Sequence, residues 1–204
     1  MKKSKRYLEI KRKIEDRSYS LNDSVNLIKD ISSAKFDESV EIHLMTNADP
    51  KNADEQIRTV ADLPHGTGKQ VRVLVFAEGD AAVSAKEAGA DFVSDDEIVK
   101  NIEKGWQDFD VAIATPDQMS KIGKLGKFLG RKGLMPNPKT GTVVQPQNIS
   151  QAISASKKGR TEIKIDSASV IHFNVGKASF TPDQLIENTK SVIKTIFDSK
   201  PEGV

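Results

Sequence analysis

The stretch from residue 71 to residue 77 limits most strongly what this chain can fold into. It reads Val-Arg-Val-Leu-Val-Phe-Ala, and apart from Arg72 it is apolar at consecutive positions rather than at alternate ones. A strand with two apolar faces needs cover on both sides, which is typical of a parallel sheet that lies between helices. We therefore expect a covered parallel sheet in this part of the chain.

The residues that follow alternate between helix and strand patterns, as such a sheet requires. We expect a helix from Asp80 to Ala88, a short strand at 91–93, a helix opened by Ser94 and a strand at 109–114. Residues 115–118 read Thr-Pro-Asp-Gln, which combines an N-cap, a proline at the first helical position and a capping-box glutamine. This alternation predicts an α/β fold with a small open sheet.

The N-terminal patterns differ from this alternation. Residues 20–23 fit a capping box, and they precede an amphipathic helix with apolar positions at 21, 25, 28 and 31. Val40, Ile42 and Leu44 alternate with polar residues, which predicts a strand with one apolar face. Residues 52–63 are interpreted as a further helix.

The C-terminal part is predicted to contain a hairpin and a closing helix. Residues 160–165 and 170–175 have strand patterns on either side of a turn at 166–169. Residues 181–184 form a second capping-box motif. The helix that they open has a predicted core stripe of Leu185, Ile186, Val192, Ile193, Ile196 and Phe197.

Neither outer part of the chain offers enough strands for a stable sheet of its own. The simplest arrangement joins them into one split domain. Residues 1–66 and 158–204 would build an α+β domain, and residues 67–157 would form an inserted α/β domain connected by two crossings of the chain. Two crossings with few other contacts would permit a hinge motion.

Basic residues are concentrated in three segments, although the net charge is only +2. Residues 1–17 contain eight Lys or Arg and three acids, residues 121–139 contain six Lys or Arg and no acid, and residues 157–164 contain four against one. The rest of the chain is therefore acidic. Basic patches on an otherwise acidic protein are typical of a protein that binds a polyanion, although solvated helix faces remain an alternative for each patch alone.

Several other classes of function are disfavoured by the sequence. The chain has no Cys and three His, so we expect no metal site and no disulfide. Residues 65–69 read His-Gly-Thr-Gly-Lys, but a phosphate-binding loop would need Gly at 63 and Ser or Thr at 70, where Leu63 and Gln70 stand. We expect no cofactor, and we interpret His65 as a turn or interdomain hydrogen-bonding residue. No apolar run is long enough to cross a bilayer, and we expect a cytoplasmic protein.

The most distinctive segment is a basic loop rich in Gly and Pro at residues 125–142. Its portion Gly-Leu-Met-Pro-Asn-Pro-Lys-Thr-Gly-Thr-Val at 133–143 resembles the signature of the ribosomal L-one stalk protein family, although Gly-Arg-Lys-Gly precedes it where the family has Gly-Pro-Arg-Gly. Further blocks match in order at 34–40, 63–68, 105–110, 114–117 and 175–180. The resemblance therefore covers nearly the whole chain, and the family has a split first domain with an inserted Rossmann-like α/β domain.

The resemblance implies a non-enzymatic protein that binds large-subunit ribosomal RNA at the mobile stalk near the exit site for tRNA. The RNA-binding positions that it implies are Lys35, Phe36, Glu38, Ser39, Arg160, Lys164 and Asp166, with Lys5 and Arg6 as weaker candidates. Phe36 could pack on a base or sugar, Ser39 and Asp166 could bond 2′-hydroxyls, and the cations could meet phosphates. The alternative for Phe36 is an ordinary core position.

The cations of the basic loop, Lys127, Arg131, Lys132 and Lys139, form a secondary basic loop that suits contacts with backbone phosphates, and the resemblance implies further partners. The partners are the ribosome, the protein's own messenger RNA, which it would repress, and exit-site tRNA; we expect a monomer when free. Family members normally continue past residue 204 through another strand to a Thr-Met-Gly loop, so we expect that this chain lacks that end. The alternatives are a protein that acts chiefly as a messenger repressor and an α/β enzyme with an active site between its domains.

Overall fold

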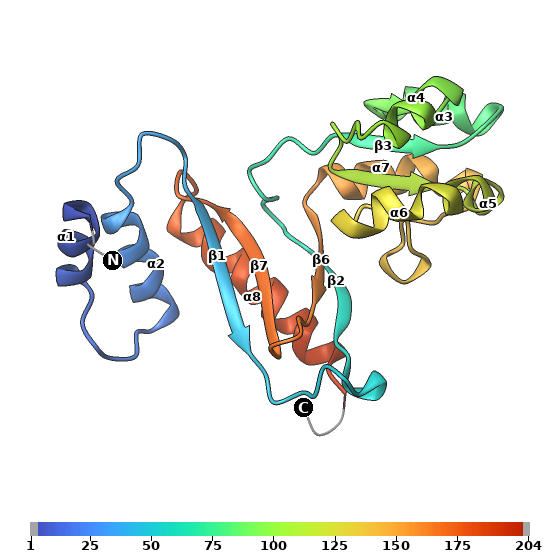
Figure 1. Cartoon of the computed structure of the whole chain (residues 1–204). Coiled ribbons are helices and arrows are strands. Elements are labelled where there is room, and N and C mark those ends of the chain that lie inside the picture. The colour runs from blue at the N-terminus through green and yellow to red at the C-terminus, as the bar shows by residue number, and fades with distance from the viewer. Residues whose placement is uncertain (1–3, 202–204) are drawn as a thin grey trace.

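The structure is a computed structural model that describes residues 4–201 (Figure 1). Lys2 and Lys3 of the first basic segment and residues 202–204 lie outside this range. No helix within residues 4–201 is both long enough and apolar enough to cross a membrane. In chain order the α-helices and strands are α1 (Lys5–Lys13), α2 (Leu21–Ile31), β1 (Ser39–Met45), β2 (Arg58–Asp62), β3 (Val73–Phe76), α3 (Asp80–Glu87), β4 (Phe92–Val93), α4 (Asp96–Glu103), β5 (Val111–Ala114), α5 (Met119–Ile122), α6 (Gly126–Leu129), α7 (Ile149–Lys157), β6 (Arg160–Lys164), β7 (Val170–Lys177) and α8 (Pro182–Ser199).

The predicted parallel sheet is confirmed, with β3 in the middle between β4 and β5. All four residues of β3 are buried, because the sheet is covered on both faces. Val73 and Val75 pack with Ile149 and Ile153 of α7, while Leu74 and Phe76 belong to a separate cluster. That second cluster also contains Ile102, Phe109, Ile122, Leu125 and Leu129. We call β3–β5 with α3–α7 the parallel region.

The helix start predicted at 115–118 is wrong in detail. Residues 116–118 form a 3-10 turn, η2 (Pro116–Gln118), and the Thr115 side chain makes no capping hydrogen bond. Short α and 3-10 pieces then continue to residue 132, namely α5, η3 (Gly123–Leu125), α6 and η4 (Gly130–Lys132). Glycines at 123, 126 and 130 explain this, since glycine weakens a helix interior. Two further 3-10 turns, η5 (Pro138–Thr140) and η6 (Pro146–Asn148), precede α7.

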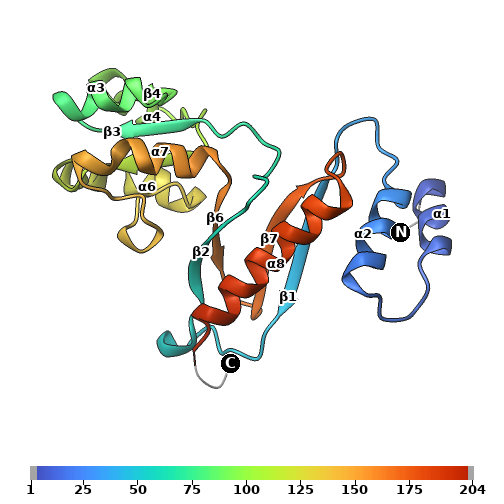
Figure 2. The ribbon, with the colours of Figure 1, turned by 180° about the vertical axis from the view of Figure 1, so that it is seen from behind.

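The outer parts of the chain meet in two antiparallel strand pairs. β1 pairs with β7, and β2 pairs with β6. Helices α2 and α8 supply Val25, Leu185, Val192 and Ile196 to a core on one face of these strands. Figure 1 shows α8 behind β1 and β7, and Figure 2 shows it in front of them. We call these four strands with α2 and α8 the antiparallel region, and the strand face opposite α8 the open face.

Three expectations for this region need correction. Residues 52–63 were expected to be helical, but only η1 (Ala53–Glu55) is, and β2 follows it. Ile57, Ala61 and Leu63 are buried and Thr59 is partly buried, which gives one inward face at every second residue; Val60 on the other face hides this strand periodicity in the sequence. The turn at 166–169 does reverse the chain, but β6 and β7 share only the bridge between Ile165 and Ile171 because each strand pairs with an N-terminal strand instead.

The third correction concerns α8, whose capping box at Thr181 and Gln184 is confirmed with both hydrogen bonds. Leu185, Val192 and Ile196 of the predicted stripe are buried, whereas Phe197 is 63% exposed. Phe197 follows the buried Ile196 by one residue, so it points about 100° around the helix, away from the core.

The two crossings between the regions touch each other at glycines. A Cβ on Gly159 would lie 2.4 Å from the Cα of Gly66, and both residues have positive φ. The fully buried Asn188 of α8 fixes this point. Its amide nitrogen donates to the carbonyl oxygens of Gly66 (3.0 Å) and Val175 (2.7 Å), and its amide oxygen accepts from the backbone N–H of His65 (3.0 Å). The first crossing is thereby tied to α8.

Asn188→Ala is expected to lower the free energy of unfolding by about 3 kcal/mol, because it leaves the buried carbonyl of Val175 and two partly buried backbone groups without partners, at about 1–3 kcal/mol for a fully buried group. Chemical denaturation followed by circular dichroism measures the change. The matched control is Asn22→Ala at an exposed position of α2, for which a change within about 0.5 kcal/mol is expected. Equal effects of the two substitutions would contradict the role of Asn188.

Candidate nucleic-acid interface

The open face carries polar and apolar side chains in cross-strand pairs. Ser39 lies opposite Lys177, Glu41 opposite Asn174, His43 opposite His172 and Met45 opposite Val170. Met45, the last residue of β1, is 81% exposed. Within residues 4–201, no helix packs over this face, so its side chains are free to meet a partner.

Phe36 lies just before β1 and is 73% exposed, which removes the alternative that it is a core residue. The segment that presents it is held firmly on both sides. Asp37 accepts hydrogen bonds from the backbone N–H (3.0 Å) and the hydroxyl (2.7 Å) of Ser179, and the carbonyl of Glu38 accepts from the N–H of Ala178 (2.8 Å). The Phe36 ring is therefore exposed to solvent on a segment that hydrogen bonds hold in place.

Two hydrogen bonds connect Arg6 and Lys177 to the segment at residues 36–39. Arg6 of α1 donates to Glu38 at 2.6 Å, and Lys177 donates to the hydroxyl of Ser39 at 2.9 Å. Partial burial raises the pKa of Glu38, but hydrogen bonds from Ser32 and Arg6 outweigh it and lower the pKa below its ordinary value. Lys5 and Lys35 are exposed. The ion pair of Arg6 leaves it less available to a phosphate than Lys35.

Asp166 organises the turn between β6 and β7. Its carboxylate accepts hydrogen bonds from the N–H groups of Ala168 (2.8 Å) and Val170 (2.9 Å) and contacts Nε2 of His172 (3.1 Å). The Val170 N–H first, and then His172, hold the pKa of Asp166 below its ordinary value. His172 also hydrogen-bonds His43 through their Nδ1 atoms, so the turn is linked across β7 to β1.

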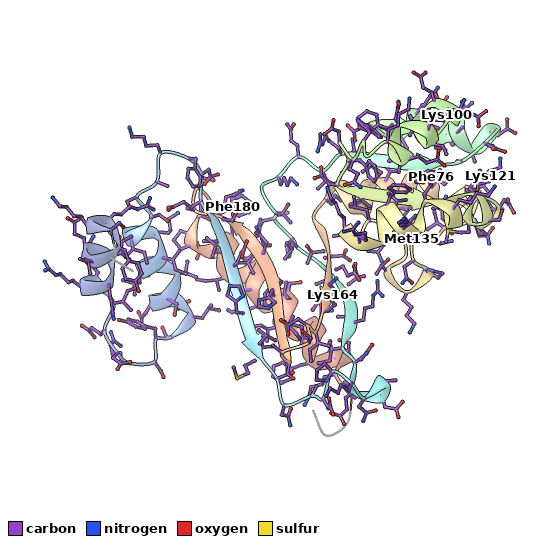
Figure 3. The ribbon with its side chains drawn as sticks, viewed as in Figure 1. Phe76, Lys100, Lys121, Met135, Lys164 and Phe180 are labelled. Carbon is purple, nitrogen blue, oxygen red and sulfur yellow. The ribbon has the colours of Figure 1, made fainter. Side chains whose placement is uncertain are left out.

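Lys164 is exposed near the same end of β6 (Figure 3). Its cross-strand neighbour Arg58 donates to Glu162 at 2.8 Å. Lys164 itself has no carboxylate within ion-pair distance among residues 4–201. It is therefore a cation available to a phosphate.

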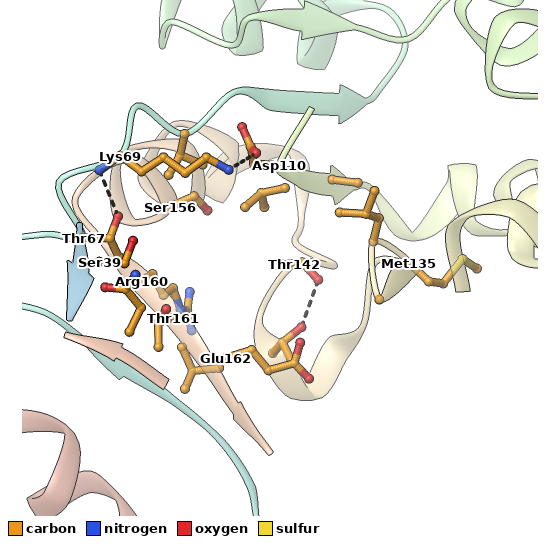
Figure 4. A pocket seen from close by; sticks show the side chains of 18 of the residues that line it. Ser39, Thr67, Lys69, Asp110, Met135, Thr142, Ser156, Arg160, Thr161 and Glu162 are labelled. Carbon is orange, nitrogen blue, oxygen red and sulfur yellow. Dashed lines mark hydrogen bonds and ion pairs between the residues drawn. The ribbon is translucent and has the colours of Figure 1, made fainter. Parts of the chain in front are cut away.

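Arg160 has a different environment from the other predicted residues. It is only partly exposed, and it lines a cleft of about 380 Å³ between the antiparallel and parallel regions together with Ser39 (Figure 4). Its Nε is buried without a hydrogen-bond partner. A Cβ on Gly141 would lie 2.8 Å from its Nη2, so its guanidinium reaches the loop of the parallel region.

An ion pair forms part of the wall of this cleft. Lys69 donates to Asp110 at 2.5 Å, and the backbone N–H of Arg72 donates to the same carboxylate at 3.0 Å. Partial burial raises the pKa of Asp110, but Lys69 and the Arg72 contacts outweigh it and lower the pKa. Within the described residues no group of three or more His, Asp or Glu side chains could hold a metal ion.

The secondary basic loop lies on the parallel region, and its 3-10 turn η5, which contains Lys139, contacts β2 of the antiparallel region. Lys127, Arg131, Lys132 and Lys139 are all exposed there, and none forms an ion pair within residues 4–201. Lys121 of the same basic segment is instead paired with Glu78.

The predicted residues therefore form three groups. Lys5, Arg6, Lys35, Phe36, Glu38 and Ser39 gather around the start of β1, Lys164 and Asp166 lie at the far end of β6, and Arg160 lies in the cleft. Sequence reasoning missed His43, Met45, His172 and Lys177, which join the first two groups. The alternation at 39–45 contained this signal, because it places residues 39, 41, 43 and 45 on the face opposite the core.

Known sequences resemble this chain along most of its length. A protein from Dehalococcoides mccartyi named large ribosomal subunit protein uL1 is 55% identical over 186 residues, which cover 91% of this chain and 78% of the relative. The proteins of that name from Fervidobacterium nodosum and Thermomicrobium roseum are 53% and 47% identical, and each match covers 100% of this chain and 86% and 85% of the relative. A sequence profile of the Ribosomal protein L1p/L10e family matches residues 28–204.

The chain therefore belongs to the Ribosomal protein L1p/L10e family. This confirms the resemblance in the basic loop and the ordered sequence blocks. Because L1p/L10e is a family of structural ribosomal proteins, the chain is not an enzyme, and the alternative of an active site between the regions is wrong.

Asp166→Asn is expected to lower the melting temperature at neutral pH, because the carboxylate stabilises the turn. A carboxyl group whose pKa is lowered by folding contributes stability above its unfolded pKa, and this contribution is lost as the pH falls through its folded pKa. The difference between the wild-type chain and the variant should therefore shrink in acid. Asp30→Asn, at an exposed position of α2, is the control, and a difference that does not depend on pH would contradict this account.

Proposed function

We propose that this chain is a structural constituent of the large ribosomal subunit that binds ribosomal RNA through the open face. The observation that carries the proposal is Phe36, an aromatic ring exposed on a segment that hydrogen bonds hold in place. Because the backbone that carries this ring is already ordered, little conformational entropy is lost when the ring packs on a partner. The relatives' name, large ribosomal subunit protein, supports the same assignment.

The chemistry of the open face suits folded RNA. Phe36 can stack on an unpaired base, as aromatic side chains do in sequence-specific RNA recognition. Lys35 and Lys164 can meet phosphates at the two ends of the face. Between them, the hydroxyl of Ser39 and the link from Asp166 through His172 offer donors and acceptors to 2′-hydroxyl groups.

We further propose that residues 1–66 and 158–204 form one domain and residues 67–157 a second, Rossmann-like domain. Separate hydrophobic clusters and the absence of strand pairing between the regions, within residues 4–201, support this division. Two crossings that meet at Gly66 and Gly159 would then be the hinge. Such a hinge suits a protein at the mobile stalk beside the exit site for tRNA.

The same surface would serve a second RNA target. We propose that the chain represses translation of its own messenger by offering the open face to it, so that messenger and ribosomal RNA compete. Exit-site tRNA would meet the secondary basic loop, whose four cations are exposed on the other region. In this proposal the free protein is a monomer in the cytoplasm, and it functions as part of the ribosome.

Phe36→Ala is expected to weaken binding to the stalk segment of large-subunit RNA by about tenfold or more, since stacking on one base is worth about 1–3 kcal/mol. The matched control is Phe197→Ala, which removes another exposed ring, on α8 outside the open face. Filter binding or fluorescence anisotropy at fixed salt measures both affinities.

Because Phe36 is exposed, its removal should leave the melting temperature nearly unchanged, and the loss of affinity can be attributed to the contact itself. Equal affinities for Phe36→Ala and the wild-type chain would contradict RNA stacking at this position. Absence of any binding by the folded wild-type chain would contradict the proposed function as a whole.

A further inference from the structure

One partly buried cation of the antiparallel region is bound by carbonyl groups rather than by an acid. Lys29 lies in the last turn of α2, and no carboxylate is within ion-pair distance of it among residues 4–201. Its ammonium donates to the carbonyl oxygens of Ala178 (3.2 Å) and Phe180. Because an ammonium loses hydration when it is partly buried, stability alone gives no clear reason for a lysine at this position.

The two carbonyl groups belong to the short connection between β7 and α8. This connection consists of residues 178–181, and we call it the β7–α8 turn. Within it, the N–H of Phe180 donates to the carbonyl oxygen of Lys177 at 3.0 Å. Lys29 reaches the turn from α2, 149 residues away from Ala178 in the sequence, and its ammonium bridges the first and third residues of the turn. The ammonium therefore ties α2 to the turn.

The β7–α8 turn in turn holds the segment at residues 36–39. The N–H and the hydroxyl of Ser179 donate to Asp37 at 3.0 Å and 2.7 Å, and the N–H of Ala178 donates to the carbonyl oxygen of Glu38 at 2.8 Å. These acceptors directly follow the exposed aromatic ring at the start of the segment. A continuous chain of hydrogen bonds therefore leads from the ammonium on α2 through the turn to the backbone that carries the ring.

Lys29 is poorly placed for a direct contact with RNA. Its ammonium is engaged by the two carbonyl oxygens, and α2 packs on the face of the strands that is opposite the open face. Lys35, by contrast, is exposed and lies next to the Phe36 ring. What Lys29 offers to RNA binding is therefore the placement of other groups.

We propose that Lys29 is a positioning residue for RNA recognition, which fixes the β7–α8 turn and, through it, the direction of the Phe36 ring. This inference rests on the proposed binding of RNA by the open face. A ring that is already held in its binding direction loses less conformational entropy when it packs on a base. Loss of the ammonium weakens binding for this reason, although it removes no contact with the RNA.

The first test is Lys29→Met, which keeps a long unbranched side chain and removes the charged donor. Its affinity for the stalk segment of large-subunit RNA is expected to fall by about threefold to tenfold, the range of ordinary coupling between linked residues. The slope of log affinity against log salt should stay unchanged, since loss of a phosphate contact would reduce it by about 0.7–0.9. The matched control is Lys190→Met, at an exposed position of α8, which should bind as the wild-type chain does.

A double-mutant cycle with Phe36→Ala separates positioning from a general loss of structure. In the Phe36→Ala chain, Lys29→Met should weaken binding by less than about twofold, because the ring through which it acts is gone. An equal loss of affinity in the Phe36→Ala and wild-type chains would overturn the positioning role. A reduced salt slope for Lys29→Met would overturn it as well, in favour of a direct phosphate contact.

Amide hydrogen exchange of the free chain measures the positioning without RNA. The N–H groups of Ala178 and Ser179 are expected to exchange at least about threefold faster in Lys29→Met than in Lys190→Met, because local opening of the turn becomes easier. Equal exchange rates would overturn the proposal even if the RNA binds. Faster exchange in Lys29→Met, together with failure of the wild-type chain to bind the stalk RNA, would instead overturn the proposed function, and the link from Lys29 to the turn would stand.

Discussion

Three hydrogen bonds from one buried side chain, Asn188, fix the place where the chain leaves the antiparallel region. Ser191 of α8 donates to the carbonyl oxygen of Asp62 (2.9 Å) and Glu187 of α8 contacts Nε2 of His65 (2.5 Å), so the contact between Gly66 and Gly159 has a fixed position relative to α8. The contact in turn allows strands that are about a hundred residues apart to pair as β2 and β6. Pairing over such a sequence separation is entropically costly, so a well-defined crossing point is important for the whole fold.

This arrangement also explains why the open face is free. Helices α2 and α8 both pack on the same side of the four strands and supply the apolar side chains of a single core. The other side is left with alternating polar residues and an exposed Met45, and the anchored Phe36 lies just before β1. A sheet covered on one face only leaves its other face available to a large polar partner, whereas the parallel sheet is buried on both faces.

The sequence predicted elements best where the periodicity was long or the capping chemistry was specific. The buried strand β3 and the capping box of α8 are examples, since both depend on residues next to each other in the chain. Strand β2 was mistaken for a helix because its partner β6 lies about a hundred residues away, and no local signal reports that pairing.

In the candidate site, too, the residues with a local sequence signal were predicted, and those that depend on pairing between distant segments were not. The family resemblance indicated Phe36 and Asp166, and the basic loop was visible from composition alone. His43, Met45 and His172 were missed because their common face exists only after β1 and β7 have paired. The position of Arg160 in a cleft between the regions could not be predicted either, because it depends on the approach of Gly141 from the parallel region.

The most direct test of RNA binding by the open face is ultraviolet cross-linking of the wild-type chain to the stalk segment of large-subunit RNA, with the cross-linked peptides mapped by mass spectrometry. The account predicts cross-links at Phe36 and at peptides of β1 and β7 that contain His43 and His172. Cross-links confined to the parallel region, with none on the open face, would contradict it.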